Sequence, residues 1–187
     1  MAFAVAPNAF DVRLLAEGTS VPVLAQSVDA VSEGSHTGHL TPEAAREAGA
    51  VGSLVNHSEN RLRLADIEHV VERLAQAGLD SIVCTNNATV SRAAAAVRPT
   101  FVAVEPPELI GGDVSVSTAR PEVISDSVAN VKAVDPGVRV LCGAGVKTGQ
   151  DIRMSLELGA EGVLLASGVA LAKDVRAVAL DLASGVP

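Results

Sequence analysis

The stretch from residue 51 to residue 86 reads VGSLVNHSENRLRLADIEHVVERLAQAGLDSIVCTN. It begins with a short apolar run, continues as an amphipathic pattern and ends in a second short apolar run. In the middle part, apolar residues recur every three or four positions from Leu62 to Leu74, and Gly78 supplies a helix stop. The two flanking runs are continuous rather than alternating, which is typical of parallel strands buried on both faces. The stretch therefore predicts one strand–helix–strand unit.

The same unit recurs along the whole sequence, without a linker or a low-complexity segment. Seven runs rich in Val, Leu and Ile predict strands at residues 2–6, 21–26, 51–56, 81–86, 101–105, 138–143 and 162–167. Helices are predicted from Thr41–Pro42 to Gly49, over residues 61–78, from residue 120 to just before Pro136–Gly137, and from about Ala170 to Leu182. We therefore predict a single α/β domain over residues 1–187.

Composition excludes several classes of function. The 14 basic and 22 acidic residues give a net charge of −8, so bulk electrostatics disfavour nucleic acid and anionic membranes as partners. No run approaches the ~20 apolar residues of a membrane-spanning helix, and the N-terminus does not resemble a signal peptide. Cys84 and Cys142 lack metal-ligand spacing and are expected to be reduced, buried thiols. We expect a cytoplasmic protein without a metal site.

Parallel βα units leave two architectures open, a doubly wound sheet and a (β/α)8 barrel. Small or polar residues follow nearly every predicted strand: Gln26, Asn56–Ser58, Thr85–Asn86, Glu105, Gly143–Gly145 and Ala166–Gly168. A closed barrel brings such strand ends to one mouth, which favours the barrel. The first strand has no GxGxxG turn after it, and no Walker sequence occurs, which disfavours dinucleotide and P-loop sites.

Two of these strand ends carry candidate catalytic side chains. His57 is predicted to lie near a helix N-terminus, which favours a neutral imidazole that donates to a carbonyl oxygen. Glu105 precedes a segment with Pro106–Pro107 at one end and Gly111–Gly112 at the other, a pattern that suits a rigid lid. A carboxylate beneath a closing lid loses water and becomes a stronger base. The structural alternatives are a histidine that only packs and a glutamate that only caps a surface turn.

The turns at residues 142–145 (CGAG) and 165–168 (LASG) form a third cluster. Small residues let backbone N–H groups approach a phosphate, and the loops after strands 7 and 8 of barrels commonly bind one. Together the three clusters predict a site for a small phosphorylated carbonyl compound.

Five motifs closely resemble archaeal-type triosephosphate isomerases in order and spacing. They are GSHTGH (34–39), NHSENR (56–61), VAVEPPELIGG (102–112), VLCGAG (140–145) and GVLLASG (162–168). The resemblance implies interconversion of dihydroxyacetone phosphate and D-glyceraldehyde 3-phosphate without a cofactor. It implies that Glu105 is the base, that His57 is the neutral electrophile, and that Glu59 and Ser58 support His57.

The resemblance also assigns the phosphate and interface residues. It implies a phosphate cradle made of Ile110, Gly111, Gly145, Ala166 and Ser167, beneath a lid at residues 106–112. It places Thr37 at a subunit interface, where it approaches the neighbouring active site.

The sequence departs from the family pattern at its start. Family members begin with one more strand, helix and turn, and that strand ends in Asn-x-Lys, whose lysine contacts the substrate. We expect this unit and its lysine to be absent, leaving an incomplete barrel of about seven strands with weak activity. Lys147 follows the phosphate turn and is expected to be a solvated surface residue, with partial replacement of the missing charge as the alternative. Two free sheet edges predict a homo-oligomer, dimer or tetramer, unless seven strands close differently or a helix fills the gap.

Two other functions stay open at this point. One is a catalytically inactive relic of the barrel that still binds small phosphorylated ligands. The other is elimination of phosphate from the enediolate, which would release methylglyoxal.

Overall fold

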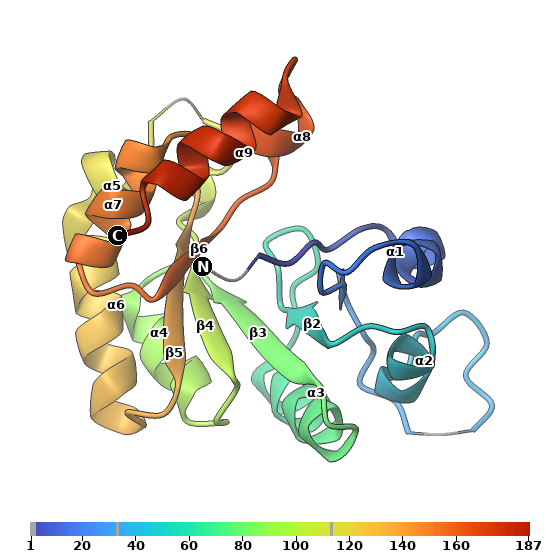
Figure 1. Cartoon of the computed structure of the whole chain (residues 1–187). Helices are drawn as coiled ribbons and strands as arrows, with labels where there is room; N and C mark the ends of the chain where they lie inside the picture. The colour runs from blue at the N-terminus through green and yellow to red at the C-terminus, as the bar shows by residue number, and fades with distance from the viewer. Residues whose placement is uncertain (1–2, 33, 113) are drawn as a thin grey trace. The chain divides into compact units, whose positions relative to one another are not determined.

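Helices and strands alternate along the chain in the computed structural model, which describes residues 3–32, 34–112 and 114–187 (Figure 1). The strands are β1 (Leu24–Ala25), β2 (Gly52–Val55), β3 (Asp80–Thr85), β4 (Phe101–Val104), β5 (Arg139–Gly143) and β6 (Gly162–Leu164). The larger helices are α1 (Val12–Gly18), α2 (Pro42–Glu47), α3 (Leu64–Gln76), α4 (Ala88–Ala95), α6 (Pro121–Val134), α7 (Gly149–Glu157) and α9 (Val175–Ser184). The short ones are η1 (Ala9–Asp11), η2 (Pro107–Leu109), α5 (Val116–Ala119) and α8 (Ser167–Ala170).

The strand order decides between the two predicted architectures. The strands are hydrogen-bonded in their chain order from β1 to β6. The pairs β1–β2, β2–β3 and β5–β6 are parallel. A doubly wound sheet reverses its order at a switch point, whereas a barrel keeps it sequential. The fold is therefore the α/β barrel type in an incomplete form, with six strands among the described residues.

The predicted strand at residues 2–6 is wrong for its described part, which forms a single parallel bridge between Val5 and Val23. Val5 N–H donates to Pro22 O (3.0 Å), and Leu24 N–H donates to Val5 O (2.8 Å). The next ladder bonds on either side would need N–H groups from Pro7 and Pro22, which proline lacks. β1 is also shorter than the predicted strand at 21–26 and comprises only Leu24–Ala25.

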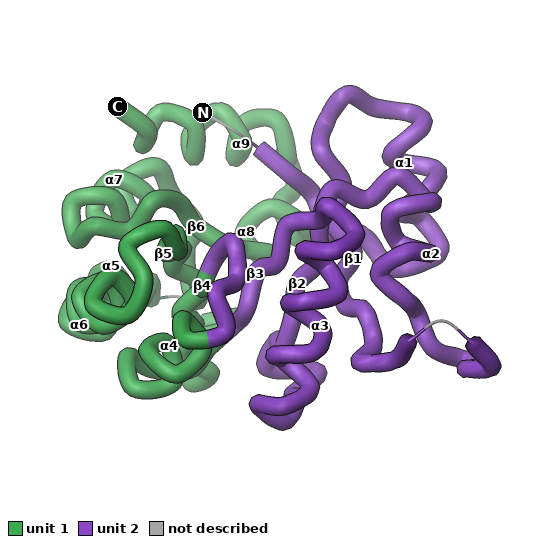
Figure 2. The backbone as a smooth tube through the Cα atoms, turned by 90° about the horizontal axis from the view of Figure 1, so that it is seen from below, with its two compact units in different colours: residues 1, 85–96, 102–187 green, residues 2–84, 97–101 purple. Residues whose placement is uncertain are grey.

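The chain divides into two compact units (Figure 2). The N-terminal unit comprises residues 3–84 and 97–101, and the C-terminal unit comprises residues 85–96 and 102–187. Apolar side chains of β2, α3 and β3 are buried in the first unit, as predicted from the periodicity: Val55, Ile67, Val70, Val71, Leu74, Ile82 and Val83. In the second unit α4 packs along α6, and α7 packs against α9.

Two helix predictions have different outcomes. Thr41 caps α2 as predicted, since its side chain accepts from Ala44 N–H (3.1 Å). The predicted helix over residues 170–182 is wrong at its start, because α8 ends at Ala170 and α9 begins only at Val175. Asp174 accepts from Ala177 N–H (2.9 Å) and fixes this later start. Among the described helices, none has the length and apolar character needed to cross a bilayer.

Candidate active site

The loop after β2 carries His57 in the N-terminal unit. The expectation of a nearby helix N-terminus is wrong, because α3 starts seven residues later, at Leu64. The backbone turns first: Asn56 has a left-handed φ of 61°, and Asn60 N–H donates to His57 O (2.8 Å). His57 therefore sits in a tight turn, and its ring is oriented by that turn rather than by the helix dipole.

The His57 ring has two neighbours at Nδ1 that require opposite protonation states. Glu59 N–H lies 3.4 Å from Nδ1 as a donor, and the Glu59 carboxylate Oε2 lies 3.6 Å from the same atom. The carboxylate side chain is 89 % exposed, whereas the backbone N–H is fixed by the turn. The backbone donor is the stronger neighbour, since an exposed ion pair is worth little in water. A ring that accepts at Nδ1 and carries a single proton holds that proton on Nε2.

Asn56 holds this loop in place through three hydrogen bonds. It was not predicted from the sequence as a site residue. Its Nδ2 donates to Cys84 O (2.9 Å), its Oδ1 accepts from Leu62 N–H (2.8 Å), and Arg61 Nη1 donates to its backbone O (3.1 Å). An asparagine directly after an apolar strand is the signal that could have found it, because Asn tolerates positive φ.

Ser58 and Thr37 are the other predicted residues of the N-terminal unit. Ser58 is half-buried in the His57 turn. Thr37 is exposed in a separate turn, where His39 N–H donates to His36 O (3.1 Å) and Gly38 has φ 90°. Such a turn presents Thr37 outward at its tip.

Glu105 follows β4 in the C-terminal unit and is only 6 % exposed. Its N–H donates to Thr85 O (2.7 Å), which continues the strand pairing by one residue. Its side chain lies on Gly143 at the end of β5. A Cβ built on Gly143 would lie 2.5 Å from Glu105 Oε1 and 2.7 Å from its Cγ. Gly143 thus leaves room for the carboxylate, a second residue whose role the sequence did not reveal.

The turn after β5 adjoins the turn after β6. Ala144 and Gly145 have φ of 76° and 72°, and Val116 N–H donates to Ala144 O (3.1 Å). A Cβ on Gly168 would lie 2.9 Å from Val146 O, so the two turns are in contact. Ala166 is exposed and Ser167, half-buried, begins α8. The structure thereby brings Gly145, Ala166 and Ser167 into one region of this unit.

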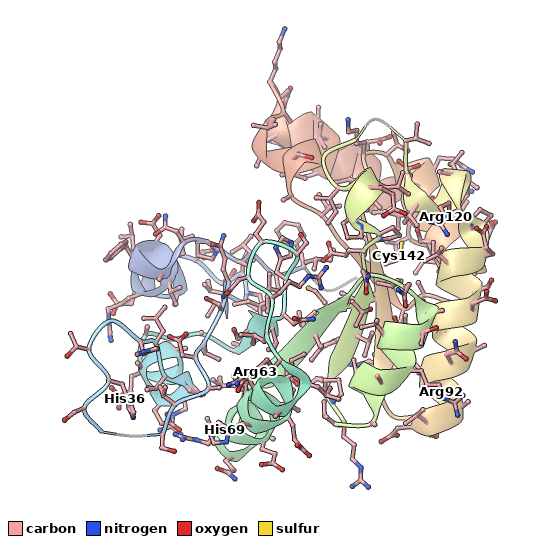
Figure 3. The ribbon with its side chains drawn as sticks, turned by 180° about the vertical axis from the view of Figure 1, so that it is seen from behind. His36, Arg63, His69, Arg92, Arg120 and Cys142 are labelled. Atoms are coloured by element: carbon pink, nitrogen blue, oxygen red, sulfur yellow. The ribbon has the colours of Figure 1, made fainter. Side chains whose placement is uncertain are left out.

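The lid segment predicted at residues 106–112 contains η2 and, just before its last residue, a left-handed Gly111 (φ 72°). Ile110 is 37 % exposed, so it is accessible from solvent. Glu108 Oε1 accepts from Arg120 Nη1 (2.7 Å), at the junction of α5 and α6 (Figure 3). This ion pair connects the segment to the helical layer of the C-terminal unit.

Cys142 lies on β5, directly before Gly143 (Figure 3). Its Sγ donates to Ser155 Oγ (3.1 Å). Burial, the largest cause, raises the pKa of the Cys142 thiol to about 11, with the Glu105 charge acting in the same direction. The thiol is therefore protonated at neutral pH and a poor nucleophile.

Lysines are sparse, and their positions matter for the expected missing cation. One Asn-x-Lys sequence does occur, at residues 130–132, but it lies inside α6. Lys132 Nζ there donates to Pro136 O, Val138 O and Glu161 Oε1. The half-buried Lys147 is closer to the turns, since its Cγ would lie 3.5 Å from a Cβ on Gly168. Within the described ranges, no three His, Cys, Asp or Glu side chains group as metal ligands.

The chain is similar to known proteins over nearly its whole length. A family model described as "Triosephosphate isomerase" matches residues 1–182. The triosephosphate isomerase of Methanothermus fervidus is 57 % identical over 172 residues, covering 92 % of this chain and 78 % of that protein. The one of Methanothermobacter thermautotrophicus is 55 % identical over 183 residues, covering 98 % and 80 %. The one of Archaeoglobus fulgidus is 56 % identical over 172 residues, covering 92 % and 77 %.

Proposed function

Because the chain belongs to the triosephosphate isomerase family, we propose that it interconverts dihydroxyacetone phosphate and D-glyceraldehyde 3-phosphate. The reaction is an aldose–ketose isomerisation that needs no metal and no organic cofactor. The observation that carries it is Glu105, a carboxylate buried at a strand end with its side chain lying on Gly143.

Glu105 is the base that removes a proton from one carbon of the substrate and returns it to the neighbouring carbon. Loss of a general base costs about 10²–10⁴ in rate. The buried position supports this role, since few water molecules compete there with the substrate for the carboxylate.

His57 is the electrophile. With Nδ1 accepting from Glu59 N–H, the ring presents an Nε2–H donor. Such a donor stabilises the negative charge that develops on the carbonyl oxygen in the enediolate. Glu59 acts here through its backbone N–H, and Ser58 belongs to the turn that carries both residues.

The phosphate is held by Ile110 and Gly111 of the lid and by Gly145, Ala166 and Ser167 of the two turns. The small residues and the contact between the turns support this cradle, because backbone N–H groups can then approach a dianion. By the family resemblance, the chain is also cytoplasmic and forms a homo-oligomer in which Thr37 approaches a neighbouring site.

We expect the isomerase activity of this 187-residue chain to be lower than that of family members that carry the Asn-x-Lys lysine. Its three lysines are Lys132, whose Nζ donates to Val138 O and Glu161 Oε1 beyond α6, the exposed Lys173, and Lys147. None of them follows a strand as Asn-x-Lys, and loss of one preorganised donor costs about 10²–10³ in rate. The same scarcity of cations favours the second candidate, a folded but inactive protein that binds small phosphorylated ligands.

A coupled isomerase assay in both directions tests these alternatives, with Glu105→Gln purified identically to control for host isomerase. Activity above the variant by about 10²-fold or more supports the isomerase. Equal traces in both samples, with phosphate-compound binding retained, support the inactive alternative. Methylglyoxal is measured in the same samples, and its release in place of the isomer would indicate that the site loses the enediolate to elimination.

A further inference from the structure

We propose that Asn56 is a positioning residue that selects the ring tautomer of His57. The inference rests on the proposed isomerase function for its catalytic consequence, but its structural content is independent of that activity. It concerns only the N-terminal unit, in which all the contacts below lie.

The Asn56 side chain bridges both ends of the loop at residues 57–61. Its Oδ1 accepts from Leu62 N–H (2.8 Å) at the far end, and its Nδ2 donates to Cys84 O (2.9 Å) on the neighbouring strand β3. Only one orientation of the amide satisfies both partners, because a backbone N–H must face oxygen and a carbonyl must face N–H. The residue is 7 % exposed, so water does not replace these bonds easily.

The presence of asparagine rather than glycine at position 56 indicates that the side-chain amide has a role. At φ 61° glycine is the least strained residue, and asparagine is tolerated. A position that needed only this backbone conformation would be served by glycine. Asparagine adds the amide that closes the loop, and both of its polar atoms have partners.

The closed loop in turn fixes the environment of the His57 ring. Asn60 N–H donates to His57 O (2.8 Å), and Glu59 N–H lies 3.4 Å from Nδ1. The second bond is long, so a small relaxation of the loop removes it. Without that donor, Nδ1 competes with Nε2 for the proton, and the fraction of rings that present Nε2–H falls.

Asn56→Gly separates the two roles, since it keeps the backbone conformation and removes the amide. Nitrogen-15 spectra of the histidine rings report the tautomer directly, with His57→Gln used to assign the His57 signals. We expect Nε2–H alone in the unmodified chain and a mixture of tautomers in Asn56→Gly. We expect kcat to fall about tenfold, with KM changed less than threefold.

Asn8→Gly is the matched control. Its amide also makes two bonds, from Phe10 N–H (3.0 Å) to its Oδ1 and from its Nδ2 to Asp11 (2.6 Å), but it lies before α1, away from the loop. The His57 signals and kcat of this variant should match those of the unmodified chain. If Asn56→Gly does not fold, Asn56→Asp replaces it, because it keeps the side-chain size and the acceptor for Leu62 N–H but loses the donor to Cys84 O.

The outcomes distinguish this inference from the proposed function. A folded Asn56→Gly with His57 still wholly in the Nε2–H form overturns the inference, as does an unmodified chain whose His57 carries its proton on Nδ1. A tautomer mixture in the variant of a chain without isomerase activity upholds the positioning role and refutes only the proposed function.

Discussion

The loop that carries His57 and the strand end that carries Glu105 are held by opposite means. In the N-terminal unit, a side-chain amide fills the space and ties backbone groups together. In the C-terminal unit, glycines leave room for neighbouring atoms that a Cβ would touch. Gly143 leaves room for the Glu105 side chain, and Gly145 and Gly168 leave room for backbone atoms. The loop that carries His57 should therefore be disturbed by removal of the Asn56 amide. The position of Glu105 should be disturbed by addition of a Cβ at Gly143.

Gly143→Ala should have the largest effect, and it is the counterpart of Asn56→Gly. The added Cβ would meet Glu105 Oε1 at 2.5 Å, Glu105 Cγ at 2.7 Å and Leu164 O at 2.8 Å. Because misplacement of a catalytic group by about 1 Å can cost 10²-fold, kcat should fall about 100-fold in the coupled assay. Overpacking should lower the free energy of unfolding by about 1–3 kcal/mol.

Gly18→Ala is the control, since a Cβ at Gly18 would meet nothing within 4 Å. This variant should keep full activity and gain about 0.5–1 kcal/mol, because Gly18 ends α1. An unchanged kcat in Gly143→Ala would show that Glu105 does not depend on the space left by glycine.

The next effect concerns the buried thiol of Cys142, directly before Gly143 on β5, and it depends on pH. Because the pKa of Cys142 is raised from 9.0 to about 11, its contribution to stability is complete below pH 9 and is lost as pH rises to 11. The unfolded thiol ionises first in that window, at a cost of about 3 kcal/mol to the free energy of unfolding. Urea unfolding at pH 8 to 11 measures this slope. The slope should be shallower in Cys142→Ala, and parallel curves for the two proteins would contradict the burial of the thiol.

The smallest expected effect is at Ala144, whose φ of 76° is unfavourable for a residue with a Cβ. Ala144→Gly should relieve about 1 kcal/mol of backbone strain and lose a similar amount from the buried methyl and the more flexible unfolded chain. Its stability should therefore stay within about 0.5 kcal/mol of the unmodified chain. Ala95→Gly, also buried but at the last residue of α4, should cost about 1–2 kcal/mol by chemical unfolding. Equal costs at both positions would mean that the turn holds no strain.

The parts of the fold that follow from burial could be predicted from the sequence. The runs at residues 51–56, 81–86 and 138–143 became β2, β3 and β5, because continuous apolar residues report burial on both faces. The run at 2–6 was equally apolar, but Pro7 and Pro22 removed the donors for a ladder. The helix predicted from Ala170 did not take into account that Asp174 can act as an N-cap. Its side chain caps α9, which therefore begins at Val175.

For the candidate site, the sequence indicated residue types better than contacts. His57 and Glu105 stand out because each is a titratable side chain at the end of an apolar run. The partners of these residues could not be predicted from the sequence. Gly143 leaves room for Glu105 because it has no side chain, and Asn56 donates to the backbone of Cys84, 28 residues along the chain. Both effects depend on three-dimensional proximity, which periodicity does not encode.

The bridge between Val5 and Val23 has a further consequence for the motions of the chain. It consists of two backbone hydrogen bonds, and the prolines on either side prevent it from growing into a ladder. A segment held to the sheet by only two hydrogen bonds can open locally while the rest of the sheet stays folded. The amides of β3, by contrast, exchange only when a much larger part of the structure opens. Hydrogen–deuterium exchange would thus begin at this bridge, and the first residues of the N-terminal unit would form the least stable cooperative segment of the sheet.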